Sequence, residues 1–110
     1  GTGTITAAQE KGLFACGNSY DQNAIAPETV LCSTVYNMTK VITTAVGQVK
    51  DGTFAGGVFY LGMAEGVVDI AGYNVLESKI PEELKTKIAE KKAAIISGEF
   101  QVPRIETPTK

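Results

Sequence analysis

The sequence predicts an α/β domain with a mostly parallel sheet flanked by helices, and three observations lead to this prediction. Short apolar runs alternate with longer stretches that carry helix-start and helix-stop signals. The 110 residues are enough for one domain with a core. A hydrophobic content of 44% with 20% charged residues separates the chain from the disordered class.

Two helices are expected in the first half of the chain. The first covers 4–11 and ends before Gly12, a residue type that favours the left-handed conformation after a helix. The second covers about 28–50, because Pro27 and the carboxylate after it suit a first helical turn. Apolar residues then recur at alternating spacings of four and three, as on one face of a helix. These residues are Leu31, Val35, Met38, Ile42, Ala45 and Val49.

Four apolar runs are candidate strands, and a third helix lies between the last two. That helix begins in "SKIPEEL" and ends near Ser97, where Gly98 stops it. The candidate strands are "LFACG", "GVFYLG", "GVVDIAGY" and "EFQVP". Three or four short strands make a thin sheet, and a parallel sheet needs both faces and both edges covered. We therefore expect the chain to be part of a longer protein or of an oligomer.

Charge and composition exclude several functions. The ten basic and twelve acidic residues are scattered, which argues against a nucleic-acid groove. The absence of histidine excludes a Cys₂His₂ zinc site and a Ser-His-Asp triad. The spacing of Cys16 and Cys32 fits neither a redox motif nor a metal knuckle, so no metal is expected. Both cysteines lie in apolar runs, which favours buried free thiols, with a disulfide as the alternative.

The carboxylates and serines show no arrangement suited to catalysis, so we expect no enzyme, no catalytic residue and no cofactor. The opening "GTGTIT" begins like a dinucleotide fingerprint, but Thr6 stands where its third glycine belongs. It is either a structural turn or a turn that lines a ligand. A nucleotide-dependent enzyme of Rossmann type is therefore kept as a rival from another functional class.

A polar loop follows the first candidate strand, and it is the main candidate binding site. Asn18, Ser19, Asp21 and Gln22 lie there, where open α/β sheets bind ligands at the carboxyl ends of their strands. Amides, a hydroxyl and a carboxylate suit a neutral polar molecule such as a sugar or nucleoside. The alternative is that Asp21 and Asn23 cap a helix or fasten the loop.

Nearly the whole chain resembles the C-terminal part of one family, the basic membrane protein (BMP) family of substrate-binding lipoproteins, which includes purine nucleoside receptors of ABC importers. The resemblance covers 1–103, and we expect 104–110 to be a loose tail. The matching stretches, in family order, are "GTGTITAAQEKGLFACG", "DQNAIAPETVLCSTVYN", "VKDGTFAGGVFYLGMAEGVVDIAGYN" and "IPEELKTKIAEKKAAIISGEFQVP".

The resemblance implies part of a type I periplasmic-binding-protein fold, in which two lobes close on a ligand. It implies a solute-binding component of an ABC importer, with a small polar ligand and the permease subunits as partners. The parent protein is then extracytoplasmic and anchored by lipid. A ligand-sensing member of the same fold, without a transport role, is the alternative. A chain cut through the hinge also exposes apolar surface, so we expect self-association.

Two positions depart from the pattern of the nucleoside-binding members. Their loop commonly reads Gly-Val-Asp-x-Asp-Gln, and its first Asp grips the ribose; here that position is Ser19, while Asp21 and Gln22 match. Their Ser-x-x-Lys stretch supplies a lysine to the ligand, and here Tyr36 takes its place. The resemblance thus adds Tyr36 to the expected ligand-binding residues and weakens a purine nucleoside as the ligand.

Overall fold

The computed structural model describes residues 1–105, so 106–110 of the predicted tail lie outside the described residues. The chain forms three α-helices, three strands and two 3₁₀ helices within that range. In chain order these are α1 (Thr2–Glu10), β1 (Ala15–Ser19), η1 (Asn23–Ile25), β2 (Val30–Tyr36), α2 (Met38–Lys50), β3 (Val68–Ile70), η2 (Asn74–Lys79) and α3 (Glu82–Ser97).

The three strands form one mixed sheet in the order β1-β2-β3. β1 pairs parallel with β2, so that Cys16 lies opposite Cys32 and Asn18 opposite Thr34. β3 joins the other side of β2 in the antiparallel direction. The predicted α/β class is confirmed, but the sheet is mixed rather than mostly parallel, because β3, which follows α2 in the chain, pairs antiparallel with β2.

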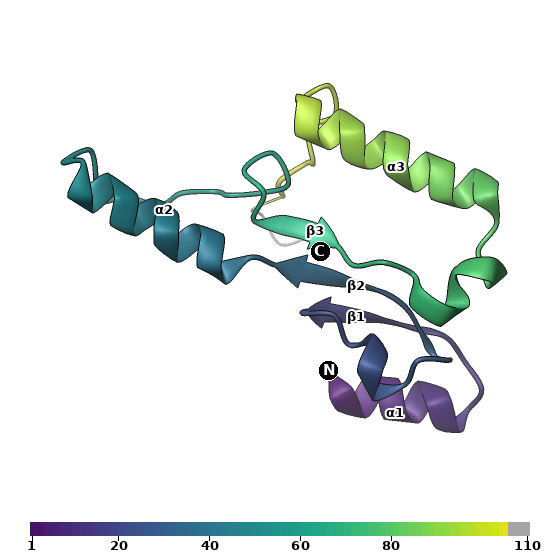
Figure 1. Cartoon of the computed structure of the whole chain (residues 1–110). Helices are drawn as coiled ribbons and strands as arrows, with labels where there is room; N and C mark the ends of the chain where they lie inside the picture. Colours follow the sequence, from purple (N-terminus) through teal and green to yellow (C-terminus); the bar gives the residue numbers. More distant parts are fainter. Residues whose placement is uncertain (106–110) are drawn as a thin grey trace.

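The core lies between β1, β2 and the elements on one side of them. α1 and η1 pack beside these strands, and α3 lies on the β3 side of the sheet (Figure 1). Ile5 of α1, Ala26 after η1 and Val30 of β2 form the buried cluster, with Ala15 and Ile25 packed against it. This small core holds the amino ends of β1 and β2 together, since Ala15 and Val30 are the first residues of the two strands and lie opposite each other.

The prediction of a helix over 28–50 is wrong for its first part. β2 occupies Val30–Tyr36, and α2 begins at Met38 after Asn37, whose side chain accepts a hydrogen bond from the backbone N–H of Lys40 at 2.9 Å. Asn37 is therefore the true N-cap. The residues before it are rich in β-branched types, which favour a strand, and the apolar spacing of four and three misled the prediction across this boundary.

The other predicted elements are confirmed except for two of the candidate strands. The first helix, the third helix and the strands at β1 and β3 are confirmed, and Gly12 and Gly98 have the positive φ angles of +63° and +80° expected after helices. "GVFYLG" and "EFQVP" form no strand among residues 1–105. A strand requires a paired neighbour, and within these residues neither apolar run has one.

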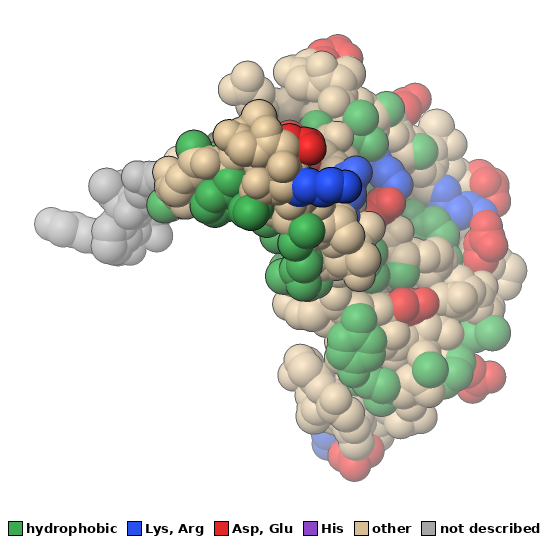
Figure 2. Space-filling model, turned by 60° about the vertical axis from the view of Figure 1, so that its left-hand side comes forward, with side chains coloured by type: hydrophobic (Ala, Val, Ile, Leu, Met, Phe, Trp, Pro, Cys, Tyr) green, Lys and Arg blue, Asp and Glu red, His purple; other side chains and the backbone are tan. Residues whose placement is uncertain are grey.

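The chain is extended for its length. Its radius of gyration is 17.2 Å, whereas a compact domain of this size has one of about 13 Å. α2 projects away from the sheet (Figure 1), and apolar side chains reach the surface of the face seen in Figure 2. The exposed ones on α2 are Met38, Ile42, Val46 and Val49. Within residues 1–105, no helix combines the length and the apolar character that crossing a membrane requires.

Candidate functional site

The candidate site lies at the carboxyl ends of β1 and β2, which meet at one edge because the two strands are parallel. Asn18 near the end of β1 is opposite Thr34 of β2. Side chains two residues apart on a strand share a face, so Tyr36 lies on the same face as Thr34. The structure thus brings together Asn18 and Tyr36, which the sequence predicted, and Thr34, which it did not.

Asn18, Thr34 and Tyr36 form a hydrogen-bonded group, here called the Asn18 cluster. The Thr34 hydroxyl donates to Asn18 Oδ1 over 2.6 Å, and the Tyr36 hydroxyl donates to the same oxygen over 3.3 Å. The shorter distance is typical of an O–H···O bond, which supports the assignment of oxygen to this side of the amide. All three residues are exposed and none carries a formal charge.

Gln22 fixes the loop behind this cluster. Its side chain is only 4% exposed, and its Oε1 accepts a hydrogen bond from the backbone N–H of Asn18 over 3.0 Å. The backbone N–H of Gln22 donates to Ser33 Oγ, also over 3.0 Å. Gln22 therefore positions Asn18 from within the fold.

Close packing at Gly17 supports the same arrangement. A Cβ at Gly17 would lie 2.9 Å from the Cβ of Gln22 and closer still to Ser33 Oγ. Glycine is therefore needed where β1 passes the Gln22 side chain.

Asp21 and Ser19 are not members of the Asn18 cluster, and their contacts are different. Asp21 Oδ1 accepts from the backbone N–H of Asn23 over 3.0 Å and from the Ser33 hydroxyl over 3.5 Å. This is an Asx turn, the loop-fastening arrangement that the sequence left open as an alternative. Ser19 is exposed, is opposite Val35 and has φ +79°, a left-handed conformation uncommon for serine.

The two cysteines lie on the same face of the sheet as the Asn18 cluster, two residues before Asn18 and Thr34. The expectation that both are buried is wrong for Cys16, which is exposed; Cys32 is partly buried. Burial first, and then the neighbouring Cys16 side chain, raise the pKa of Cys32 to about 11. Within residues 1–105, no group of three or more histidine, cysteine or acidic residues is placed to hold a metal ion.

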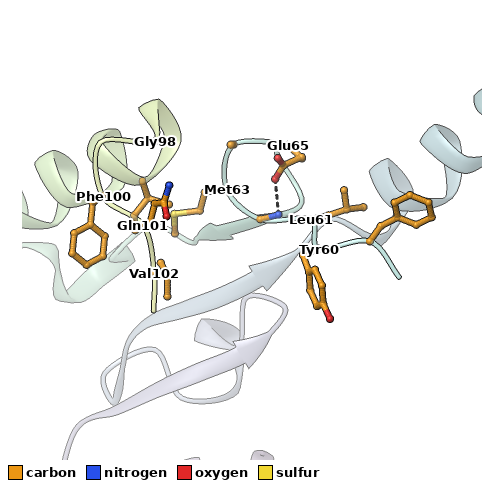
Figure 3. A pocket seen from close by; sticks show the side chains of 12 residues that line it. Tyr60, Leu61, Met63, Glu65, Gly98, Phe100, Gln101 and Val102 are labelled. Carbon is orange, nitrogen blue, oxygen red and sulfur yellow. Dashed lines mark hydrogen bonds between the residues drawn. The ribbon is translucent and has the colours of Figure 1, made fainter. Parts of the chain in front are cut away.

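A separate groove of about 910 Å³ opens between the loop at 59–65 and the residues around the end of α3 (Figure 3). Its lining is mainly apolar and aromatic, and none of the predicted site residues reaches it. Glu65, the one charged residue of 1–105 that lines it, accepts a hydrogen bond from the backbone N–H of Gly62 over 2.7 Å. Glu65 thus shapes its own loop, and the groove follows from the unpaired "GVFYLG" segment.

Sequence reasoning missed Thr34 because it placed this residue in a helix. A strand over "VLCSTVY" would have put Cys32, Thr34 and Tyr36 on one face by simple alternation. The parallel direction of β1 and β2 would then have placed Asn18 near Thr34 and Tyr36. The signal was present in the β-branched residues of this run.

Comparison with known proteins places this fold and loop in a family. The family model described as "ABC transporter substrate-binding protein PnrA-like" matches residues 1–106. Basic membrane protein C of Borreliella burgdorferi is 32% identical over 111 residues, which cover 96% of this chain and 30% of that protein. A purine-binding protein of Brucella abortus is 31% identical over 99 residues, or 90% of this chain and 27% of that protein.

The transcriptional activator protein Med of Bacillus subtilis is also similar. It is 31% identical over 86 residues, which cover 78% of this chain and 26% of that protein. The chain thus spans about 30% or less of the length of these curated relatives.

Two solved structures share the fold. A transcriptional activator of the comK gene from Bacillus halodurans superposes with a TM-score of 0.79 at 23% identity, over 94% of this chain and 35% of that one. An ABC transporter solute-binding protein from Aeropyrum pernix superposes with a TM-score of 0.73 at 20% identity, over 96% and 37%. The fold is therefore part of a periplasmic-binding-protein fold, as predicted. The chain belongs to the Bmp family of PnrA-like ABC transporter substrate-binding proteins.

Proposed function

We propose that this chain supplies part of the ligand site of a solute-binding protein that serves an ABC importer. The ligand is a small, uncharged polar molecule, of which a nucleoside is one example. The observation that carries the proposal is the Asn18 cluster, a charge-free hydrogen-bonding group at the carboxyl ends of two parallel strands. The ligand-binding residues are Asn18, Ser19, Thr34 and Tyr36, and Asp21 and Gln22 hold the loop that presents them.

The hydrogen bonds within the cluster define what it offers to a ligand. Both acceptor positions of Asn18 Oδ1 are used by the two hydroxyl donors, which leaves the amide Nδ2 with two hydrogens to donate. The hydroxyls of Thr34 and Tyr36 keep lone pairs that can accept. Tyr36 is 46% exposed, so its ring can stack on a planar group. A heterocycle with a carbonyl and an N–H matches these three properties.

The lack of charge argues for a neutral ligand. A carboxylate in the place of Ser19 could accept two hydrogen bonds from a ribose, and a serine hydroxyl cannot. The loss of such a charged contact costs about 1.5–3 kcal/mol. We therefore propose that ribose contributes less to recognition here than in the nucleoside-binding relatives. The purine-binding protein of Brucella abortus supports a nucleobase as the recognised part.

The rest of the binding protein completes the proposal. Because the chain spans 30% or less of its relatives, we infer that residues 1–103 belong to a two-lobed protein and that a further segment closes the ligand site. An extracytoplasmic location, a lipid anchor and contact with permease subunits follow from the transport role. Ligand capture requires no catalytic residue and no cofactor.

A ligand-sensing role is the second candidate, and two similarities favour it. The Med protein of Bacillus subtilis and the comK activator of Bacillus halodurans are named as transcriptional activators. The binding chemistry would be the same, and only the partner would differ. Capture of permease subunits by the full-length protein would support transport, whereas a response of gene expression to the ligand would support sensing.

The binding proposal is tested by amide NMR spectra of the 110-residue chain during titration with uridine, inosine and adenosine 5′-monophosphate. The two neutral nucleosides should shift the Asn18 side-chain NH₂ signals and the backbone signals of Thr34 and Tyr36. The charged nucleotide should shift them less at the same concentration. The Asn18→Asp variant replaces the donor with a charge and should lose the response to both nucleosides.

A control variant makes the same replacement of an amide by a carboxylate outside the site. Gln48→Glu adds a carboxylate on the exposed face of α2 and should leave the titration unchanged. Signals that move only around the groove at 59–65, or a stronger response to the nucleotide than to the nucleosides, would contradict the proposal.

A further inference from the structure

The two cysteines occupy directly opposed positions on neighbouring parallel strands. Cys16 of β1 is in register with Cys32 of β2, and the two sulfur atoms are 3.7 Å apart. Both thiols are free, and the Cys32 thiol donates a weak hydrogen bond to the Cys16 sulfur. Neighbouring strands lie about 4.7–4.9 Å apart, which falls within the span of about 4.4–6.8 Å that a disulfide bridges between Cα atoms.

The two thiols differ in access to solvent. Cys16 is exposed, so a reagent in solution can reach it, whereas Cys32 is partly buried beside it. Burial raises the pKa of Cys32 to about 11, which keeps this thiol protonated near neutral pH. Only thiolates attack disulfides. The difference in exposure therefore makes Cys16 the entry point.

We infer that Cys16 and Cys32 form a redox modification site, at which a small-molecule disulfide converts the two thiols into one intrachain disulfide. The Cys16 thiolate attacks one sulfur of oxidised glutathione, forms a mixed disulfide and releases one glutathione. The small fraction of Cys32 that has lost its proton to solvent then attacks the adjacent Cys16 sulfur, 3.7 Å away in the reduced chain, and releases the second glutathione. In sum, two cysteine thiols are oxidised and one glutathione disulfide is reduced to two thiols.

The bond would join β1 to β2 close to the proposed ligand site. It would lie two residues before the Asn18–Thr34 hydrogen bond, on the same face of the sheet. It would also close the connection 17–31 into a covalent loop, which restricts the unfolded chain. Oxidation should therefore raise the midpoint of thermal unfolding and keep the two strand ends in register.

The test is incubation of the native, fully reduced chain with oxidised glutathione, followed by intact-mass analysis and titration of free thiols. The expected product is a monomer that has lost two hydrogens, carries no glutathione and has no free thiol. Thermal unfolding of this product should occur at a higher temperature than that of the reduced chain. Addition of dithiothreitol should restore both the mass and the unfolding temperature.

Two variants test the order of events. Cys32→Ser should accumulate a stable glutathione adduct at Cys16, while Cys16→Ser should react far more slowly because the remaining thiol is partly buried and protonated. Their far-UV spectra establish that they fold; if either does not, the wild-type product alone decides. A lasting glutathione adduct on the wild type, or disulfide-linked dimers that persist on dilution, would overturn the inference.

Discussion

The phenol of Tyr36 donates a hydrogen bond to the side-chain oxygen of Asn18 over 3.3 Å, and this bond joins the end of β2 to the end of β1. The partner oxygen also accepts the Thr34 hydroxyl, so a single amide links three side chains. Tyr36 lies where the nucleoside-binding pattern has a lysine. The proposed binding group therefore carries a phenol, oriented by its neighbours, at a position where that pattern has a cation.

Removal of this phenol should weaken ligand binding more than stability. Tyr36→Phe keeps the ring and deletes the hydroxyl, and an exposed neutral hydrogen bond contributes about 0.5–1.5 kcal/mol. We expect nucleoside affinity to fall roughly threefold to tenfold, because Asn18 loses one of its two orienting donors. NMR titration measures this change. Tyr73→Phe makes the same deletion outside the site and should leave affinity unaltered; equal losses in both variants would contradict the role of Tyr36.

Two glycine-to-alanine variants should change stability in opposite directions. At Gly17 the new methyl group collides with Ser33 Oγ and Gln22, so overpacking should cost about 1–3 kcal/mol of unfolding free energy. At Gly47, inside α2, nothing lies within 4 Å of a Cβ, and alanine should add about 0.5–1 kcal/mol through its higher helix propensity. Urea denaturation monitored by circular dichroism measures both values. A stabilising Gly17→Ala would refute the close packing beneath the loop.

The free energy of unfolding should decrease at acid pH, in part because the ion pair between Asp69 of β3 and Lys92 of α3 is lost. The charged atoms of this pair are 2.5 Å apart. The hydrogen bond from Lys92, followed by that from the Ile70 backbone, lowers the pKa of Asp69 below its usual 3.8. A lowered pKa stabilises the folded state above the unfolded-state pKa. This contribution is lost as pH falls through the lower, folded-state value.

The Asp69→Asn variant should lack this acid-sensitive part. Because both side chains are partly exposed, with 51% for Asp69 and 37% for Lys92, we expect a contribution below about 1 kcal/mol. Urea midpoints measured from neutral pH down to acid pH give the difference between variant and wild type. Glu83→Gln, whose partner Lys87 lies on the same helix, serves as control. If the urea midpoint of Asp69→Asn falls at acid pH as much as that of the wild type, the ion pair does not stabilise the contact between β3 and α3.

The chain should self-associate through the apolar stripe of α2. Met38, Ile42 and Val49 are 57%, 59% and 62% exposed, and a stripe of this kind is normally buried against a partner. Ile42→Lys should shift sedimentation towards the monomer without loss of helix signal. Gln48→Lys changes charge without removing an apolar side chain and should have little effect. A single monomeric species for the wild type at all concentrations would rule out this prediction.

The sequence was informative where local signals are strong. Gly12 and Gly98 ended helices where expected, and "LFACG" led into the strand that carries Asn18. The loop was also recognised as a polar structure at the end of a strand. Each of these features depends on backbone preferences within a few residues.

The features that the sequence did not predict depend on pairing between residues that are distant in the chain. The apolar spacing through Leu31 and Val35 is typical of a helix, but this segment forms the strand β2 because it pairs with β1. "GVFYLG" has strand composition, yet no described residue pairs with it. The group around Asn18 was predicted in part, because Thr34 joins it only through the register of β1 and β2. Local patterns carry no direct information on register.

The buried Gln22 fixes the backbone of the loop independently of the exposed side chains around it, here called rim residues. Its amide oxygen and the Ser33 hydroxyl hold the loop from inside, the exposed Asp21 carboxylate fastens it through the Asx turn, and none of these groups belongs to the Asn18 cluster. We therefore expect the exposed Tyr36 to tolerate exchange without a change of the loop backbone, whereas Ser19 is restricted by its φ angle of +79°. In the resemblance drawn from the sequence, Asp21 and Gln22 match the nucleoside-binding pattern while Ser19 and Tyr36 depart from it, so the proposal implies one loop frame that presents different side chains to a ligand.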